Sequence, residues 1–138
     1  MNKLYAESHI RNLILMAKSD NHMDDRELAV ILKIGQEKGF SKDEIEYFIQ
    51  DDSNFDLIQP TEIIECFEQL YDLGLVMIAD GIIEDDEIDF CTDFAEKLGL
   101  SSKEANMITF SIAEGLENNF SKYTIYETTK KLLQEIGE

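Results

Sequence analysis

The chain has 138 residues, which suits one domain, and its 43% apolar content is enough for a hydrophobic core. One proline and seven glycines argue against a turn-rich β protein, and the many Glu, Leu, Ile, Lys and Ala residues favour helices. The net charge is −18, and residues 20–120 hold −20, because residues 1–19 carry +2 and residues 121–138 are balanced. Such a charge repels nucleic acid and anionic lipid, and favours cations, basic proteins or simple solubility.

Seven helices are predicted along the chain. Ile10, Leu13, Ile14 and Ala17 recur with helical period and define one apolar face of the first. A short polar linker at 52–59 separates the third helix from the fourth. The predicted helices cover about residues 2–19, 25–38, 42–51, 61–79, 85–98, 102–115 and 122–136. The expected fold is therefore all-α, a bundle of about seven helices in one domain over residues 1–138.

The fourth predicted helix has a proline at its start and a glycine inside it. Pro60 suits a first helical position, where no backbone N–H is required. Gly74 lowers helix propensity unless a neighbouring helix needs a close approach. The Met, Phe and Tyr side chains of the chain fall at helical spacing, so we expect them in the core.

The sequence repeats itself at an offset of 60 residues. Without gaps, Leu13–Ile49 aligns with Leu73–Thr109. The identical pairs are Leu13/Leu73, Leu15/Leu75, Asp20/Asp80, Asp25/Asp85, Glu27/Glu87, Gly39/Gly99, Ser41/Ser101 and Glu44/Glu104. Such a repeat predicts two copies of one helical unit. We expect repeat one over residues 2–51, repeat two over 61–115, and a C-terminal helix over 122–136 that closes the bundle.

Each copy contains a predicted stop between two helices. Gly39 and Gly99 follow helical stretches, and glycine accepts the left-handed conformation that ends a helix. The segments Ser41–Glu44 and Ser101–Glu104 then have the serine and glutamate spacing of a capping box. Each copy is therefore expected to hold a helix, a short stop and another helix.

Each copy also has an acidic turn before its middle helix. The turns read Asp20-Asn21-His22-Met23-Asp24-Asp25-Arg26-Glu27 and Asp80-Gly81-Ile82-Ile83-Glu84-Asp85-Asp86-Glu87. Asn21 and Gly81 occupy the same position, and both residue types tolerate positive φ. The second turn is not an EF-hand loop, because Val76 and Ile78 stand where calcium ligands are required.

Two interpretations of the acidic turns stay open. In the first, Asp24 and Glu84 cap the next helix, while Glu27 and Glu87 complete capping boxes. In the second, the turns form two oxygen-rich sites that bind Ca²⁺ or Mg²⁺, with no organic cofactor. The second interpretation pairs Asp20 with Glu27 and Asp80 with Glu87, and its candidate metal ligands are Asp20, Asp24, Glu27, Asp80, Glu84 and Glu87.

The motif Ala-Asp-Gly-x-Ile-x-x-x-Glu at Ala79–Glu87, with a degenerate copy at Ser19–Glu27, resembles the TerB family of tellurite-resistance proteins. It is also similar to the TerB-like domain of some membrane-anchored DnaJ-like co-chaperones, although no J-domain signature is present. The resemblance covers about Leu4 to Leu116. It implies a pseudo-twofold bundle of about seven helices and a pair of acidic motifs.

The same resemblance implies a function. TerB-like proteins are linked to tellurite and other stress responses and are suspected of binding divalent metal. They are thought to act by association, some with membrane-protein partners, and not by catalysis. We therefore expect a non-enzymatic, TerB-like binding protein that binds divalent cations through its two acidic turns and is linked to stress or tellurite response. The resemblance also implies a protein partner, one that is itself associated with a membrane.

The remaining features narrow the classes of function. Cys66 and Cys91 lack zinc-site spacing and are interpreted as small apolar helix residues in a reducing compartment. His22 is interpreted as a solvated loop residue, the alternatives being a metal ligand or a pH sensor. No signal peptide or membrane-spanning stretch is visible, so we expect a cytoplasmic protein without direct membrane insertion.

Two rival functions are kept. One is an acidic protein-interaction module whose carboxylates are purely structural. The other is a metal-dependent enzyme, since paired carboxylates can act as acid and base. No Ser/His/Asp or Cys/His set and no phosphate-binding loop is present, and two similar acidic turns suit binding better than catalysis.

Overall fold

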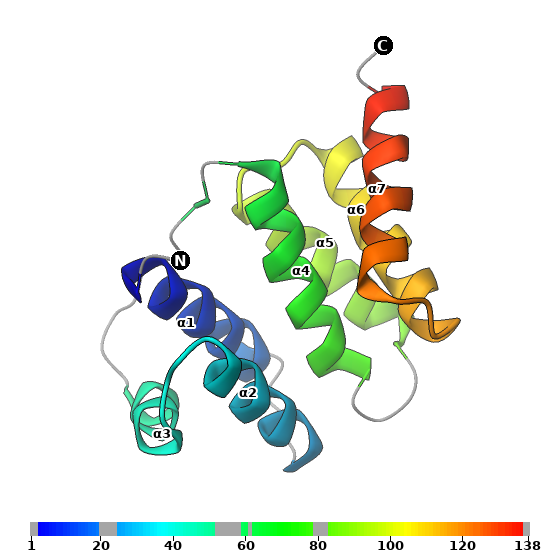
Figure 1. The fold of residues 1–138 in the computed structure, drawn as a ribbon. Helices are drawn as coiled ribbons and strands as arrows, with labels where there is room; N and C mark the ends of the chain where they lie inside the picture. Colours follow the sequence, from blue (N-terminus) through cyan, green and yellow to red (C-terminus); the bar gives the residue numbers. More distant parts are fainter. Residues whose placement is uncertain (1–2, 20–24, 52–58, 61, 79–82, 137–138) are drawn as a thin grey trace. The chain divides into compact units, whose positions relative to one another are not determined.

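A computed structural model of the protein describes residues 3–19, 25–51, 59–60, 62–78 and 83–136. These residues form seven α-helices (Figure 1), which are α1 Lys3–Ser19, α2 Asp25–Glu37, α3 Lys42–Gln50, α4 Ile63–Met77, α5 Asp85–Lys97, α6 Ser102–Glu117 and α7 Lys122–Ile136. The predicted all-α bundle is confirmed. The chain divides into two compact units, unit 1 over Met1–Ile58 and unit 2 over Gln59–Glu138. The prediction of a single domain stays a prediction.

Unit 1 consists of α1, α2 and α3. Ile10, Leu13, Ile14 and Ala17 of α1 are all buried, which confirms the predicted apolar face of the first helix. α1 contacts both α2 and α3, and these two helices contact each other. Apolar side chains buried in α2, in α3 and between them are Ile31, Ile34, Phe40, Ile45 and Phe48.

Two basic side chains of α1 contact the C-terminal end of α3. The Arg11 guanidinium lies 4.5 Å from the centre of the Phe48 ring and donates to Asp51 Oδ2 at 3.0 Å. Lys18 Nζ donates to the carbonyl oxygen of Ile49 at 2.6 Å. The last carbonyls of a helix lack partners within it and carry partial negative charge, so cations there are stabilising.

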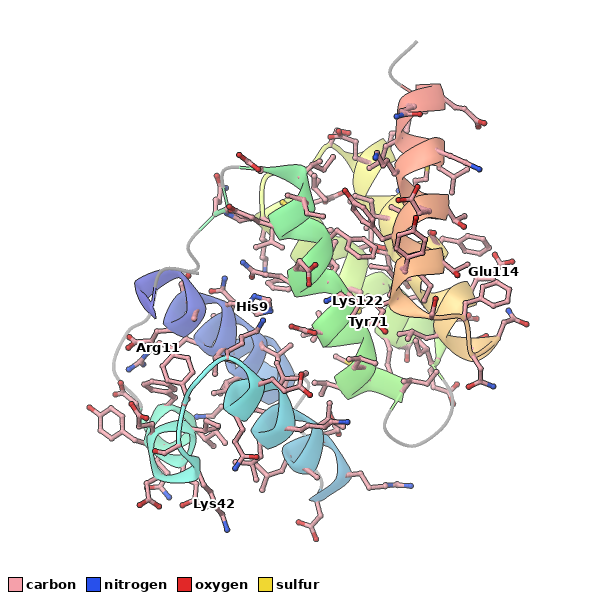
Figure 2. All side chains as sticks on the ribbon, viewed as in Figure 1. His9, Arg11, Lys42, Tyr71, Glu114 and Lys122 are labelled. Carbon is pink, nitrogen blue, oxygen red and sulfur yellow. The ribbon has the colours of Figure 1, made fainter. Side chains whose placement is uncertain are left out.

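Unit 2 consists of α4, α5, α6 and α7, and α6 contacts the other three helices. The rings of Phe67 in α4 and Tyr126 in α7 meet edge to face, with centres 5.3 Å apart. Lys122 at the start of α7 forms an ion pair with Glu68 and lies 5.2 Å from the centre of the Tyr71 ring (Figure 2). The last helix therefore closes this unit against α4 and α6.

The start of the fourth helix differs from the prediction. α4 begins at Ile63, with Glu62 in extended conformation before it, so the placement of Pro60 at a first helical position is wrong. The reason is a contact distant in sequence. Gln59 Nε2 donates to the carbonyl oxygen of Lys97 at 3.2 Å, so this segment covers the C-terminal end of α5.

Within the part of the chain that the structure describes, a helix stop of one kind occurs three times. Gly39 and Gly99 have φ values of +98° and +104°, as predicted, and Asn119 has a φ of 59°. After each stop, the next N–H donates to a carbonyl oxygen five residues earlier, as in a Schellman motif. These bonds run from Phe40 to Gly35 at 3.0 Å, from Leu100 to Ala95 at 3.3 Å and from Phe120 to Gly115 at 2.9 Å.

A serine cap follows each stop and begins the next helix. Ser41 and Ser101 form the two predicted capping boxes with Glu44 and Glu104. Ser121 makes the serine bond of such a box, because its Oγ accepts from the N–H of Thr124 at 3.1 Å. We call each stop with its serine a helix corner, and the third corner lies outside the predicted repeats.

The two units agree in detail at the predicted offset. α2 and α5 both begin and end at positions that differ by 60 residues, and α3 and α6 begin at 42 and 102. Ile31 and Cys91 are both buried, as are Ile34 and Phe94. A duplication predicts such agreement, while the repeat itself and its pseudo-twofold symmetry stay predictions.

Glycines allow α6 to approach its neighbours closely. A Cβ atom on Gly74 would lie 2.9 Å from Leu116 Cδ1 and 3.1 Å from Ile112 Cγ2, so α4 makes a close approach of the kind that justifies a glycine inside a helix. A Cβ atom on Gly115 would overlap the side chain of Ile125 in α7. Ile125 is only 1% exposed, so it has little room to move.

We expect Gly115→Ala to lower the free energy of unfolding by about 1–3 kcal/mol, because Ile125 has to shift within a packed core. This loss outweighs the gain in helix propensity from glycine to alanine, which is about 1 kcal/mol or less. Urea unfolding measures the difference. Glu117→Ala, at an exposed position of the same helix, is the control and changes stability by less than about 0.5 kcal/mol. Equal stability of Gly115→Ala and the natural protein would contradict the described contact between α6 and α7.

Candidate functional site

The acidic turn of unit 2 leads directly into α5. Ile83 is buried, Glu84 is the N-cap residue, and Glu87 is the third helical residue. The backbone N–H of Glu84 donates to Glu87 Oε1 at 3.0 Å, which is the hydrogen bond that the capping interpretation predicts for Glu87. One oxygen of this carboxylate therefore stabilises the start of α5.

The other candidate ligands are only partly placed by the structure. Glu27 is the third residue of α2, as Glu87 is of α5, and is half-buried. Asp20, His22, Asp24 and Asp80 lie outside the described residues. Among the residues that the structure does describe, no group of three His, Cys, Asp or Glu side chains is placed to hold a metal ion. The predicted pairing of Asp20 with Glu27, and of Asp80 with Glu87, stays a prediction.

Beyond the turn, α5 carries a row of exposed carboxylates. We call Asp85, Asp86, Asp89, Asp93 and Glu96 the acidic stripe; all are exposed. Their spacing of three and four residues places them on one side of the helix. In the described part of the chain, no basic side chain forms an ion pair with any of them. Among the described residues, the stripe is therefore a negative surface without an ion pair.

A groove runs along the same helix. It lies between α5, α6 and α7 and has a volume of about 760 Å³; we call it the α5–α7 groove. Its polar lining includes Asp89, Glu114 of α6 (labelled in Figure 2) and a single basic residue, Lys103. Its large apolar lining residues are Ile88, Met107, Phe110, Phe120, Ile125 and Leu132. The groove therefore combines an apolar floor with an acidic edge.

Several aromatic side chains are exposed, so the prediction that the Met, Phe and Tyr residues lie in the core is wrong for them. Phe110 is 61% exposed and Phe120 is 52% exposed, and both line the groove. Phe120 follows the third helix corner, where it corresponds to Phe40, which is 3% exposed. Its exposure arises because no described helix covers this corner. The similarity of Asn119-Phe120-Ser121 to Gly39-Phe40-Ser41 is a sequence signal for the third corner, but by analogy with Phe40 it predicts a buried Phe120.

The two cysteines are free and buried, in α4 and α5, which agrees with their interpretation as small apolar helix residues. Burial, with a smaller contribution from Glu65, raises the pKa of the Cys66 thiol from 9.0 to about 11. Burial and the nearby Glu87 raise the pKa of Cys91 from 9.0 to about 12. Both thiols therefore stay protonated at neutral pH and are poor nucleophiles.

Comparisons with known proteins place no further constraint on the function of this chain. Comparisons with protein-family models, with curated proteins and with solved structures find no match. None of the helices described by the structure is both long enough and apolar enough to cross a bilayer. The features that bear on function are therefore the acidic stripe, the helix caps and the α5–α7 groove.

The raised thiol pKa values predict a loss of stability at alkaline pH. Between about pH 9 and pH 11 the thiols ionise in the unfolded chain but stay protonated in the folded one, so the free energy of unfolding falls as pH rises. Urea unfolding at pH 8 and pH 10 measures the fall, and Cys91→Ala reduces it. The pKa values of Tyr71 and Lys122 are also raised, so part of the fall persists in this variant. A fall of the same size in Cys91→Ala and the natural protein would contradict the assignment.

Proposed function

We propose that this protein is a non-enzymatic, TerB-like association module of the cytoplasm, which binds a basic protein partner through its acidic surface. The observation that supports this proposal is the acidic stripe of α5. Carboxylates three and four residues apart on a helix repel one another, and no described basic side chain forms an ion pair with these. A basic partner relieves it on binding and is also attracted to the surface from a distance.

The resemblance of the motif at Ala79–Glu87 to TerB-like proteins suggests the context of this association. A role in stress or tellurite response, and a partner that is itself associated with a membrane, both follow from the sequence motif alone. The acidic stripe supports a partner with a basic surface, and experiment identifies that partner.

The association is expected to be sensitive to salt and to the stripe. The full chain, immobilised, should retain cytoplasmic proteins at about 50 mM NaCl and release them at about 500 mM, because salt screens exposed charges. Asp85→Asn with Asp89→Asn and Asp93→Asn should weaken retention about tenfold, at about 0.5 kcal/mol for each lost contact. Quantitative mass spectrometry of the retained proteins measures the loss.

The matched control removes the same charge from exposed positions of unit 1. Glu37→Gln with Asp43→Asn and Glu46→Gln lowers the net negative charge equally but leaves the stripe intact. We expect this control to retain the same proteins as the natural chain. Equal loss in both variants would show a general charge effect, and retention that survives high salt would show that electrostatics is not the main cause; either result contradicts the proposal.

Divalent-cation binding at the acidic turns is the second candidate function. It is favoured by the exposed carboxylates of Glu84, Asp85 and Asp86, which gather at the positive end of α5 without a basic partner in the described residues. Oxygen ligands of this kind suit Ca²⁺ or Mg²⁺.

A titration separates a cation site from a helix cap. If the turns bind Ca²⁺ or Mg²⁺, an ion concentration of 100 times Kd adds about 2.7 kcal/mol of stability and raises Tm by several degrees. Asp80→Asn with Glu87→Gln should abolish this gain, while glutamine still accepts the capping bond and preserves stability without the ion. NaCl at equal ionic strength is the control. An unchanged gain in the variant, or no gain in the natural protein, would reject the site.

A further inference from the structure

The α5–α7 groove exposes more apolar surface than its helices need for their own packing. Phe110 and Phe120, more than half exposed, stand at the groove, while Ile88 and Leu132 line it from the helices on either side of α6. A contiguous apolar surface with polar groups beside it is typical of an interaction site.

The third helix corner explains why this surface is unfilled. In the first corner, the apolar residue after the stop is Phe40, which is buried beside Phe48 with ring centres 5.5 Å apart. In the third corner, the corresponding residue is Phe120, which has the same hydrogen bonds but stays exposed. The backbone hydrogen bonds therefore fix the position of Phe120. Its exposed ring can contact an apolar group of another molecule.

The charge along the groove restricts the occupant. Asp89 lines the groove, and Asp85 and Asp93 lie one turn before and after it on the same side of α5. Lys103 is the single basic residue of the lining. A second copy of this chain, with a net charge of −18, would bring like charges together, and anionic lipid would be repelled in the same way. The complementary surface is apolar in the middle and basic along one side.

We propose that the α5–α7 groove binds an amphipathic helix of the partner protein, with its apolar face on Phe110 and Phe120 and its Lys or Arg residues along the acidic stripe. A helix in a groove presents apolar anchors at the spacing i, i+3, i+4 and i+7, with basic residues beside them. This inference rests on the proposed association function and assigns it a place and a class of partner segment.

A designed peptide tests the groove directly. The probe is a fluorescein-labelled 18-residue amphipathic helix with leucine at i, i+3, i+4 and i+7 and lysine elsewhere, titrated with the full chain at about 50 mM NaCl. We expect saturable binding in fluorescence anisotropy with a Kd below about 100 μM. A scrambled peptide of the same composition should bind at least tenfold more weakly, and so should a peptide with glutamate in place of lysine.

Variants of the protein show where the peptide binds. Phe110→Ala with Phe120→Ala should raise Kd at least tenfold. Tyr47→Ala with Tyr123→Ala, which removes two aromatic rings that are 63% and 72% exposed and lie outside the groove lining, should leave Kd unchanged. Thr128→Arg adds a large positive side chain to the groove without removing an apolar one, and should also weaken binding. Circular dichroism and Tm show whether each variant is folded.

The outcomes separate this inference from the proposed function. Unchanged peptide affinity in Phe110→Ala with Phe120→Ala and in Thr128→Arg would overturn the groove assignment, as would equal binding of the scrambled peptide. If the stripe variant still loses its retained proteins in that case, the association function stands without the groove. Failure of the natural chain to bind the peptide, together with binding of an uncharged apolar dye that Thr128→Arg abolishes, would overturn the inference and assign the groove to a small apolar ligand.

Discussion

The corner between α5 and α6 is the constraint on which the candidate site depends. Gly99 ends α5 in a left-handed conformation, Leu100 donates back to Ala95, and the capping box of Ser101 with Glu104 begins α6 within the next residues. Because the connection is so short, α6 must return alongside α5. The acidic stripe on α5 and the exposed phenylalanine of α6 therefore come to the same side of unit 2.

Charge and apolar surface have separate origins in this unit. The core side chains of α5, such as Cys91 and Phe94, are buried, while the carboxylates occupy the opposite side of the helix. The groove arises between these two sides, where α7 is held close to α6 by Gly115 and Ile125 but leaves Phe120 uncovered. An acidic surface alone would not require a partner. The acidic stripe and the exposed apolar groove together favour one.

Local signals were predicted well from the sequence, and contacts between distant residues were not. The left-handed residues Gly39 and Gly99 and the two serine capping boxes could be predicted because each depends on a few neighbouring residues. The start of α4 was misplaced because Gln59 interacts with Lys97, thirty-eight positions away. Likewise, the helical period identifies Phe110 as part of an apolar face, but it cannot say whether another helix covers that face. The capping bond of Glu87 could be predicted from spacing, whereas the lack of ion pairs to the stripe among the described residues could be seen only in the fold.

The three helix corners also bear on the order in which the chain folds. Their hydrogen bonds join residues no more than five positions apart, for example Phe120 with Gly115, so each corner closes with very little loss of chain entropy. Chains dominated by such short-range contacts fold fast, on the microsecond to millisecond scale. Helical hairpins should therefore form early within each unit, before the pairing of α4 with α7, whose residues Glu68 and Lys122 are separated by more than fifty positions.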